Sequence, residues 1–170
     1  MTTRPLTLSV ATVTLPGGPL TVAVAPDGVV HRSAFGSADA LLEALPGAVV
    51  VDPAELPGGV ADALARYAAG EVAALDRVPV QQPGGAYWQS VWAVMREIPA
   101  GSTVSYSELA RRAGRPTAVR AAASACARNL LAPFVPCHRV VRSDGSLGGY
   151  AYGLETKRAL LDHERRGAAG

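Results

Sequence analysis

The chain has 170 residues, of which 49% are apolar and 18% charged, and its formal net charge is +2. This composition is typical of a soluble globular protein, and the length suits one domain or two small ones. No apolar run is long enough to cross a bilayer, and the first ten residues lack the features of a secretory signal. We therefore expect a cytoplasmic protein that makes no contact with membranes.

The charge is divided unevenly along the chain. Residues 1–86 contain four arginines and no lysine against eight acidic residues, a net charge of −4. Residues 87–170 contain twelve basic and six acidic residues, a net charge of +6. A basic half favours contact with phosphates. Charge alone leaves a solvated basic face as an equal alternative.

The sequence contains two cysteines, Cys126 and Cys137. Two cysteines are too few for a disulfide scaffold or for a cysteine-rich structural zinc site, and they favour a reduced setting. We expect no metal and no cofactor.

The first half of the chain has strand patterns followed by helical ones. Residues 6–15 alternate apolar and small polar side chains, as a half-buried strand does. Turns at Pro16–Gly18 and Pro26–Gly28 separate further strands within residues 20–35. Helical spacing follows in residues 38–45 and 59–71.

A stretch rich in proline and glycine, residues 76–88, is the expected domain boundary. We expect a structural α/β domain over residues 1–80 and a mostly helical domain over residues 81–170.

The second half has helical patterns with clear start and stop signals. Residues 88–98 have helical spacing with one apolar face. Ser105 and Glu108 form a capping-box pattern, in which each side chain satisfies an orphan amide group of the other residue. Gly114 ends the helix that follows, and Thr117 is expected to cap the next one. Two short helices joined by a tight turn are typical of a helix-turn-helix.

The second of these helices has only small side chains between Arg120 and Arg128. One interpretation is a buried helix packed closely on its neighbours. The other is a helix whose backbone approaches a ligand surface, with Arg120 as its one long side chain. The composition leaves both interpretations open.

Cys137 and His138 are adjacent in an apolar run that follows Pro136. The thiolate is the nucleophilic form of cysteine, and a neighbouring base can generate it. Neighbours in an extended segment point to opposite faces, so direct contact needs a bend or a bridging water. A carboxylate that orients the histidine would complete a relay. The downstream candidates are Asp144, Glu155, Asp162 and Glu164. These residues alone leave a reactive Cys–His pair and a buried structural cysteine as equal alternatives.

Three motifs, one of which contains this pair, add to the evidence. Residues 104–110 read VSYSELA, residues 136–140 read PCHRV, and residues 148–164 contain GGY followed by GLETKRALLDHE. Together they resemble the O6-alkylguanine-DNA alkyltransferases, also called methylated-DNA–protein-cysteine methyltransferases. The likeness is strong over about residues 80–165, and residues 14–30 weakly resemble the N-terminal domain of this family.

The resemblance implies an α+β fold. A small RNase H-like N-terminal domain would precede a winged-helix-like DNA-binding domain that contains the helix-turn-helix and the active site. It also implies direct transfer of the alkyl group from O6-alkylguanine, with O4-alkylthymine as a second candidate, to a cysteine that is consumed. Cys137 would be the nucleophile, His138 a general base acting through a water, and Glu164 the carboxylate that orients the imidazole.

Four residues match positions that contact DNA in this family: Tyr106, Arg120, Ala121 and Ser124. Tyr106 would rotate a phosphate and donate a hydrogen bond to the guanine ring. Arg120 would enter the base stack where the target nucleotide leaves. Small side chains at Ala121 and Ser124 would let the helix backbone approach the minor groove. The expected partner is double-stranded DNA containing O6-alkylguanine, bound by a monomer, and cooperative binding along DNA is left open.

Six residues match positions in or near the base pocket: Asn129, Val140, Tyr150, Ala151, Tyr152 and Lys157. Asn129 resembles an asparagine that stabilises the turn before the active-site strand. Val140 resembles a residue whose backbone carbonyl accepts a hydrogen bond from the guanine amino group. Lys157 aligns with a lysine near the pocket, although an exposed helix lysine is equally consistent with its charge.

The sequence departs from the family pattern at six positions: Ala123, Ser124, Leu130, Ala132, Ala151 and Tyr152. Ala151 replaces a serine that can help to bind O6, and Tyr152 places a large ring where glycine is usual. The size of the accepted lesion is therefore open.

Two other functions remain as alternatives. One is a helix-turn-helix protein that binds alkylated DNA and recruits repair factors without alkyl transfer. The known proteins of that type lack the reactive cysteine, so Cys137 argues against it. The other is a thiol hydrolase, which would explain neither Arg120 nor the basic half of the chain.

Overall fold

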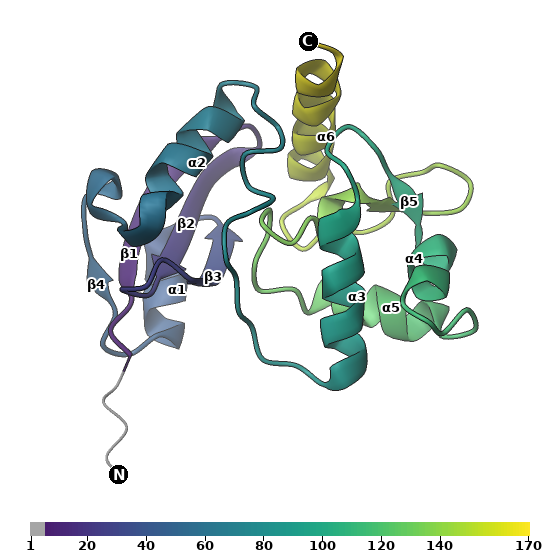
Figure 1. The fold of residues 1–170 in the computed structure, drawn as a ribbon, viewed down its shortest axis with the longest axis horizontal. Helices are drawn as coiled ribbons and strands as arrows, with labels where there is room; N and C mark the ends of the chain where they lie inside the picture. Colours follow the sequence, from purple (N-terminus) through teal and green to yellow (C-terminus); the bar gives the residue numbers. More distant parts are fainter. Residues whose placement is uncertain (1–5) are drawn as a thin grey trace.

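The computed structural model describes residues 6–170, which form a small sheet followed by a set of helices (Figure 1). In chain order the elements are β1 (Ser9–Leu15), β2 (Gly18–Val24), β3 (Val30–Phe35), α1 (Ala38–Ala44), β4 (Val49–Val50), α2 (Val60–Ala68), α3 (Ala86–Glu97), β5 (Val104–Ser105), α4 (Tyr106–Arg112), α5 (Val119–Ala127), β6 (Val140–Val141) and α6 (Leu154–Ala169). Short 3₁₀ turns occur at Pro53–Glu55, Pro57–Gly59 and Cys137–Arg139. Within residues 6–170, no helix combines the length and the apolar character needed to cross a bilayer.

The first four strands form one sheet in the order β3-β2-β1-β4, antiparallel except for the β1–β4 pair. The β1–β2 hairpin turns at Gly17, whose φ of 101° is readily adopted only by glycine. Alternate side chains of the hairpin face opposite sides of the sheet. Leu20 and Val22 join the core formed with α2, whereas Val10 and Ala23 join a smaller core with α1. The strands, turns and two helices expected in this half are confirmed.

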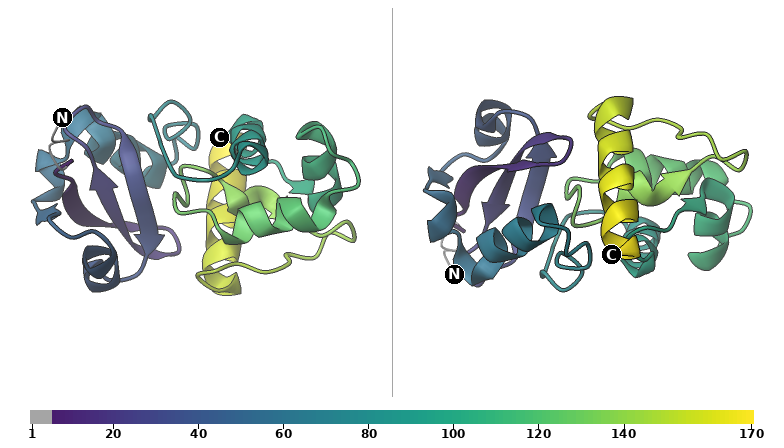
Figure 2. Two further views of the ribbon diagram at one scale, coloured as in Figure 1. Left: turned by 90° about the horizontal axis from the view of Figure 1, so that it is seen from below. Right: turned by 90° about the horizontal axis from the view of Figure 1, so that it is seen from above.

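The sheet contacts the second half of the chain along β3. Isolated bridges join Val30 to Val80 and Ser33 to Leu131, and the Ser33 hydroxyl donates to the Ala132 carbonyl at 2.7 Å. Helix α6 lies between the sheet and helices α4 and α5 in the views of Figure 2. The segment that leads to Cys137 is therefore held against the N-terminal sheet.

Helices α4 and α5 form the expected pair of short helices; Ser105 caps α4 as predicted, but only half of its capping box forms, and the cap of α5 is not the predicted one. The Ser105 hydroxyl accepts from the Glu108 amide at 3.0 Å, which is half of a capping box. The other half does not form, because the Glu108 carboxylate instead accepts from two arginines of its own helix. The cap of α5 is Ala118 and not Thr117, since a backbone bond from Ala118 to Arg115 closes one more turn before the helix begins.

Candidate active site

Cys137 lies at the start of a 3₁₀ turn directly after Pro136, so the chain bends at this pair of residues. The turn sends the two neighbouring side chains into different surroundings. The Cys137 sulfur accepts a hydrogen bond from Asn129 Nδ2 at 3.3 Å and lines a pocket. His138 is fully buried and bonds through Nε2 to Glu164 Oε1 at 2.7 Å.

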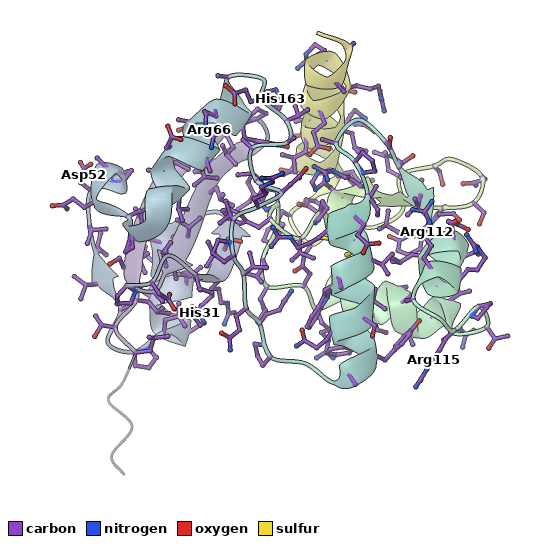
Figure 3. All side chains as sticks on the ribbon, in the orientation of Figure 1. His31, Asp52, Arg66, Arg112, Arg115 and His163 are labelled. Carbon is purple, nitrogen blue, oxygen red and sulfur yellow. The ribbon has the colours of Figure 1, made fainter. Side chains whose placement is uncertain are left out.

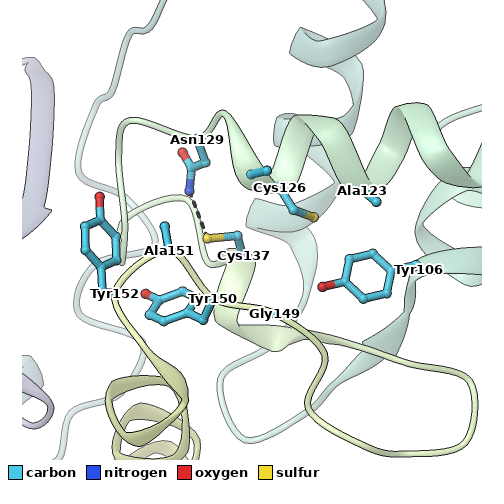
Figure 4. A pocket seen from close by; sticks show the side chains of 10 residues that line it. Tyr106, Ala123, Cys126, Asn129, Cys137, Gly149, Tyr150, Ala151 and Tyr152 are labelled. Carbon is cyan, nitrogen blue, oxygen red and sulfur yellow. Dashed lines mark hydrogen bonds between the residues drawn. The ribbon is translucent and has the colours of Figure 1, made fainter.

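A pocket of about 270 Å³ opens at Cys137 (Figure 4). Its lining residues are Tyr106, Ala123, Cys126, Ala127, Asn129, Cys137, Gly149, Tyr150, Ala151 and Tyr152. Tyr106 lies on one side of the pocket and Tyr152 on the other, with the sulfur between them (Figure 4). The structure thus brings together in one pocket the nucleophile candidate and five further residues predicted for the site.

Of the four carboxylates considered for the relay, Glu164 is the one that contacts His138. Asp144 accepts from Ser146 within an exposed turn, Asp162 pairs with Arg165, and Glu155 is exposed in the first turn of α6.

Glu164 accepts four hydrogen bonds in a fully buried position. Besides His138, the Tyr67 hydroxyl donates to it at 2.8 Å. The Arg139 guanidinium donates from Nε and Nη2, each at 2.9 Å. Three of these bonds end on Oε1 and one on Oε2, so both oxygens of the buried carboxylate have donors.

These contacts set the protonation states of the pair. Burial alone would raise the pKa of Glu164, but His138 and Arg139 lower it well below its usual range. Burial lowers the pKa of His138, although the neighbouring carboxylate raises it in part. At neutral pH the glutamate is therefore ionised and the imidazole is neutral. Because a carboxylate only accepts, we assign the imidazole proton to Nε2, which leaves a lone pair on Nδ1.

Nδ1 of His138 is buried and has no hydrogen-bond partner among the described residues. A neutral imidazole with a free lone pair on one nitrogen and an ionised carboxylate on the other can act as a general base.

The Cys137 thiol rests in its protonated form. Burial raises the pKa of Cys137, and the hydrogen bond from Asn129 and the charge of Lys157 lower it only in part. A nucleophile of this kind needs a base to remove its proton at the moment of reaction. Burial also raises the pKa of Tyr106 to about 12, so its phenol remains a hydrogen-bond donor.

Lys157 is fully buried, so the interpretation as an exposed helix lysine is wrong. Its ammonium donates to the carbonyls of Val140 at 2.7 Å and Gly149 at 3.3 Å, and to that of Leu147. It thereby ties the strand after the active-site turn to the loop that walls the pocket. The Val140 carbonyl, expected to accept from guanine, already accepts from Lys157.

The remaining predicted residues lie outside the pocket. Arg120 and Ser124 are exposed on α5, and Ala121 is half-buried. The opposite face of this helix is packed tightly, with Ala122 and Ala125 fully buried. The small-residue helix thus has one face in the core and one face free. The packed face confirms the first interpretation, and the approach of the free face to a ligand stays a prediction.

Exposed arginines continue at this end of the molecule. Arg112 and Arg115 lie at the end of α4 and in the turn that follows, on the side away from the sheet (Figure 3). A row of cations near an exposed helix is suited to contact with phosphates.

Sequence interpretation missed three residues near the reactive groups: Tyr67, Gln82 and Arg139. Arg139 lies inside the PCHRV motif, and this position was the one sequence feature that could have indicated a role in the site. Gln82 was assigned to the linker, yet it is buried and donates to Asn129 Oδ1 at 3.0 Å. Tyr67 belongs to α2 and reaches Glu164 across 97 positions of sequence.

Comparison with known proteins places these features in a family. A family model described as 6-O-methylguanine DNA methyltransferase, DNA binding domain, matches residues 86–166. The bifunctional transcriptional activator/DNA repair enzyme Ada of Escherichia coli is 54% identical over 87 residues, which are 51% of this chain and 25% of Ada. The chain therefore spans only a quarter of the length of that relative.

Two further proteins match over more of their length. A methylated-DNA–protein-cysteine methyltransferase of Mycobacterium bovis is 43% identical over 114 residues, or 67% of this chain and 68% of the relative. The structure of Mycobacterium tuberculosis OGT in complex with DNA superimposes with a TM-score of 0.76 at 33% identity, and the match covers 94% of each chain. On the combined strength of these matches and of the buried Cys–His–Glu arrangement, the chain belongs to the methylated-DNA–protein-cysteine methyltransferase family.

Proposed function

We propose that this protein repairs DNA by moving the methyl group of O6-methylguanine onto Cys137, once per protein molecule. The observation that carries the proposal is a pocket-lining thiol that is followed in sequence by a neutral, buried histidine held by an ionised glutamate. The names of the relatives and the DNA complex of the mycobacterial protein support DNA as the partner. O4-methylthymine is a second candidate lesion.

The reaction balances in one displacement. The thiol proton passes through a bridging water to Nδ1 of His138, while Nε2–H continues to donate to Glu164. The thiolate attacks the methyl carbon, so that an S–C bond forms and the C–O6 bond breaks with its electron pair left on guanine. The guanine anion takes a proton from the Tyr106 hydroxyl, and protonated His138 returns its proton through water to Tyr106, so that in total one proton has moved from Cys137 to guanine. The thioether product is a poor leaving group, so the cysteine is not regenerated.

A lesion inside a duplex cannot reach a buried sulfur, so the nucleotide must leave the helix. We assign this step to α5, which presents small side chains to the minor groove, while Arg120 fills the space left in the base stack. The tightly packed opposite face of α5 supports the helix during this contact. A helix-turn-helix that binds lesions without transfer would not need the base and carboxylate buried behind Cys137.

Several finer features complete the proposal. Residues 1–80 form a structural RNase H-like domain, and residues 81–170 form a winged-helix-like domain with the active site. The location of the four-stranded sheet before residue 51 and of α4 and α5 after residue 105 supports this division. We expect a monomer in a reducing cytoplasm, with cooperative binding along DNA to be measured.

The decisive experiment uses a duplex with a labelled O6-methyl group. Incubation should place one label per molecule on Cys137, found in the peptide containing residue 137 by mass spectrometry. Cys137→Ala should abolish the transfer while retaining duplex binding, and Cys126→Ala should leave it unchanged. Binding without transfer would support the recruiting alternative, and many turnovers per molecule would contradict the proposal.

Tyr152 is expected to restrict the size of the lesion. Its ring lines the pocket and is fixed by edge contacts with Phe35 at 5.6 Å and Tyr150 at 5.5 Å between centroids. Tyr152→Gly should raise the ratio of O6-benzylguanine to O6-methylguanine repair rates by about tenfold or more, as steric differences in apolar pockets do. Tyr152→Phe keeps the ring and should leave the ratio unchanged. An unchanged ratio in Tyr152→Gly would show that the ring does not limit access.

A further inference from the structure

Gln82 is a buried polar side chain in the connection between α2 and α3, and its two neighbours in sequence are exposed. It lies between α2 and α3, with only 6% of its surface exposed, while its neighbours Gln81 and Pro83 are both exposed. A buried amide has to be hydrogen-bonded to avoid a large cost of desolvation. The partners of Gln82 therefore indicate why this side chain is turned inward.

Both ends of the Gln82 amide are bound to the segment that leads to Cys137. Nε2 donates to Asn129 Oδ1 at 3.0 Å, and Oε1 accepts from the Leu130 amide at 2.8 Å. The Gln82 carbonyl in turn accepts from Gln89 Nε2 at 2.8 Å, which anchors the connection to α3.

The contacts of Asn129 show what Gln82 holds in place. Asn129 Oδ1 accepts from Gln82 and from the Leu131 amide at 3.0 Å. Asn129 Nδ2 donates to the Val135 carbonyl at 2.8 Å and to the Cys137 sulfur at 3.3 Å. Figure 4 shows the amide nitrogen directed at the sulfur across the pocket edge.

The orientation of this amide decides whether the sulfur faces a donor or an acceptor. If the amide rotated by 180°, Nδ2 would face two N–H donors, and Oδ1 would face a carbonyl and the sulfur. A developing thiolate is favoured by a donor and opposed by an acceptor. Every donor that fixes Asn129 Oδ1 therefore acts indirectly on the sulfur, and Gln82 supplies the only side-chain donor that the described residues give to this oxygen.

We propose that Gln82 is a positioning residue of the methyl-transfer site, which keeps the Asn129 amide aimed so that it donates to the Cys137 sulfur. The proposal rests on Cys137 being the nucleophile, as proposed above. It assigns a role in the reaction to the connection between the sheet and α3. Gln82 itself does not touch the sulfur and acts through Asn129.

The test measures the reactivity of the two thiols without DNA. Gln82→Met keeps the size of the side chain and removes both hydrogen bonds, and Gln82→Glu keeps the acceptor for Leu130 while removing the donor to Asn129. Gln81→Met makes the same exchange at the exposed neighbour and is the matched control. Alkylation by iodoacetamide is followed between pH 7 and 9.5 by mass spectrometry of the separate Cys126 and Cys137 peptides.

In both Gln82 variants we expect Cys137 to react about threefold to tenfold more slowly at each pH. This corresponds to a displacement of its pH–rate curve by about half to one unit, the size expected for one weakened hydrogen bond. Cys126 lines the same pocket and receives no bond from Asn129, so its rate should be unchanged. Gln81→Met should alter neither thiol.

Two results would overturn the proposal. If Cys126 and Cys137 both become more reactive, Gln82 merely closes the pocket. If neither changes, Asn129 is held without it. Methyl transfer from an O6-methylguanine duplex at pH 7.5 should fall by the same factor as iodoacetamide alkylation. Absence of methyl transfer in the unaltered protein would sink the proposed function while leaving the iodoacetamide comparison valid.

Discussion

Replacing Glu164 by glutamine is expected to lower the free energy of unfolding by about 3–5 kcal/mol, the usual cost of removing one partner from a buried ion pair. The Arg139 guanidinium is only 3% exposed and directs two of its nitrogens at this carboxylate. Glutamine would leave that charge uncompensated and would oppose one of the surrounding donors with its own NH₂ group. Urea unfolding at pH 7 measures the loss.

Glu155→Gln provides the matched control, because it makes the same change on the same helix at an exposed position. Its effect should stay below about 1 kcal/mol, the range of a charge near a helix N-terminus. Equal losses in the two variants would show that Glu164 is not held in the buried ion pair described here.

The same pair makes stability depend on pH. The pKa of Glu164 is lower in the folded protein than its unfolded value of 4.5, so its contribution is present above pH 4.5 and is lost as the pH falls below that value. The pKa of His138 is also lowered, by burial, from 6.5. The unfolded chain therefore binds the proton that the folded protein excludes, and stability begins to fall below pH 6.5.

Urea midpoints between pH 7 and pH 3.5 should thus decline in two stages. In Glu164→Gln the decline of the urea midpoint below pH 6.5 should remain, and the further decline that Glu164 causes below pH 4.5 should be absent. Methyl transfer should follow the neutral form of His138, so the acid limb of its rate should lie below pH 6.5. Parallel midpoint curves for the two proteins would contradict this account of the carboxylate.

Local patterns in the sequence were sufficient for much of the fold. Period-two alternation predicted β1, and glycine-containing turns predicted the hairpin that joins it to β2. Alternation and turns depend on residues that are close in sequence, so they can be predicted without knowing the tertiary structure. The second half of the α4 capping box and the Thr117 cap of α5 were wrong, because both depend on competing local bonds. The Glu108 carboxylate accepts from two arginines of its own helix and makes no bond to the amide that it was expected to bind.

The reactive centre was only partly accessible from sequence. The motifs located Cys137, His138 and Glu164, but their protonation states follow from burial and from partners distant in the chain. Tyr67 and Gln82 reach the site across 97 and 47 positions to Glu164 and Asn129. A lone tyrosine on an amphipathic helix and a glutamine in a linker carry no local signal of such contacts. These contacts form only when tertiary packing brings the distant segments together.

Arg120→Ala is expected to reduce repair of O6-methylguanine in a duplex by about tenfold to a hundredfold. Extruding a nucleotide costs a few kcal/mol, and a guanidinium that stacks in the vacated space recovers about 1–3 kcal/mol. Arg120 is exposed on α5 and outside the pocket lining, so the reactive groups should be unaffected. Reaction with the free base O6-benzylguanine should therefore proceed at the normal rate.

Arg128→Ala separates this role from a general loss of charge. Arg128 is an exposed arginine at the other end of the same helix, so its removal changes the net charge equally. It should weaken duplex binding modestly and lower the salt dependence by about one phosphate contact, with little effect on the rate once the protein is bound. Single-turnover rates at saturating protein isolate the step after binding.

A duplex that already contains a mismatch opposite the lesion gives a further check on Arg120. A weakened base pair lowers the cost of extrusion, so the defect of Arg120→Ala should shrink on that substrate and vanish on a single strand. Arg128→Ala should show the same small defect on matched and mismatched duplexes. If Arg120→Ala loses activity equally on matched duplex, single strand and free base, Arg120 acts on the chemistry of the pocket and has no part in nucleotide extrusion.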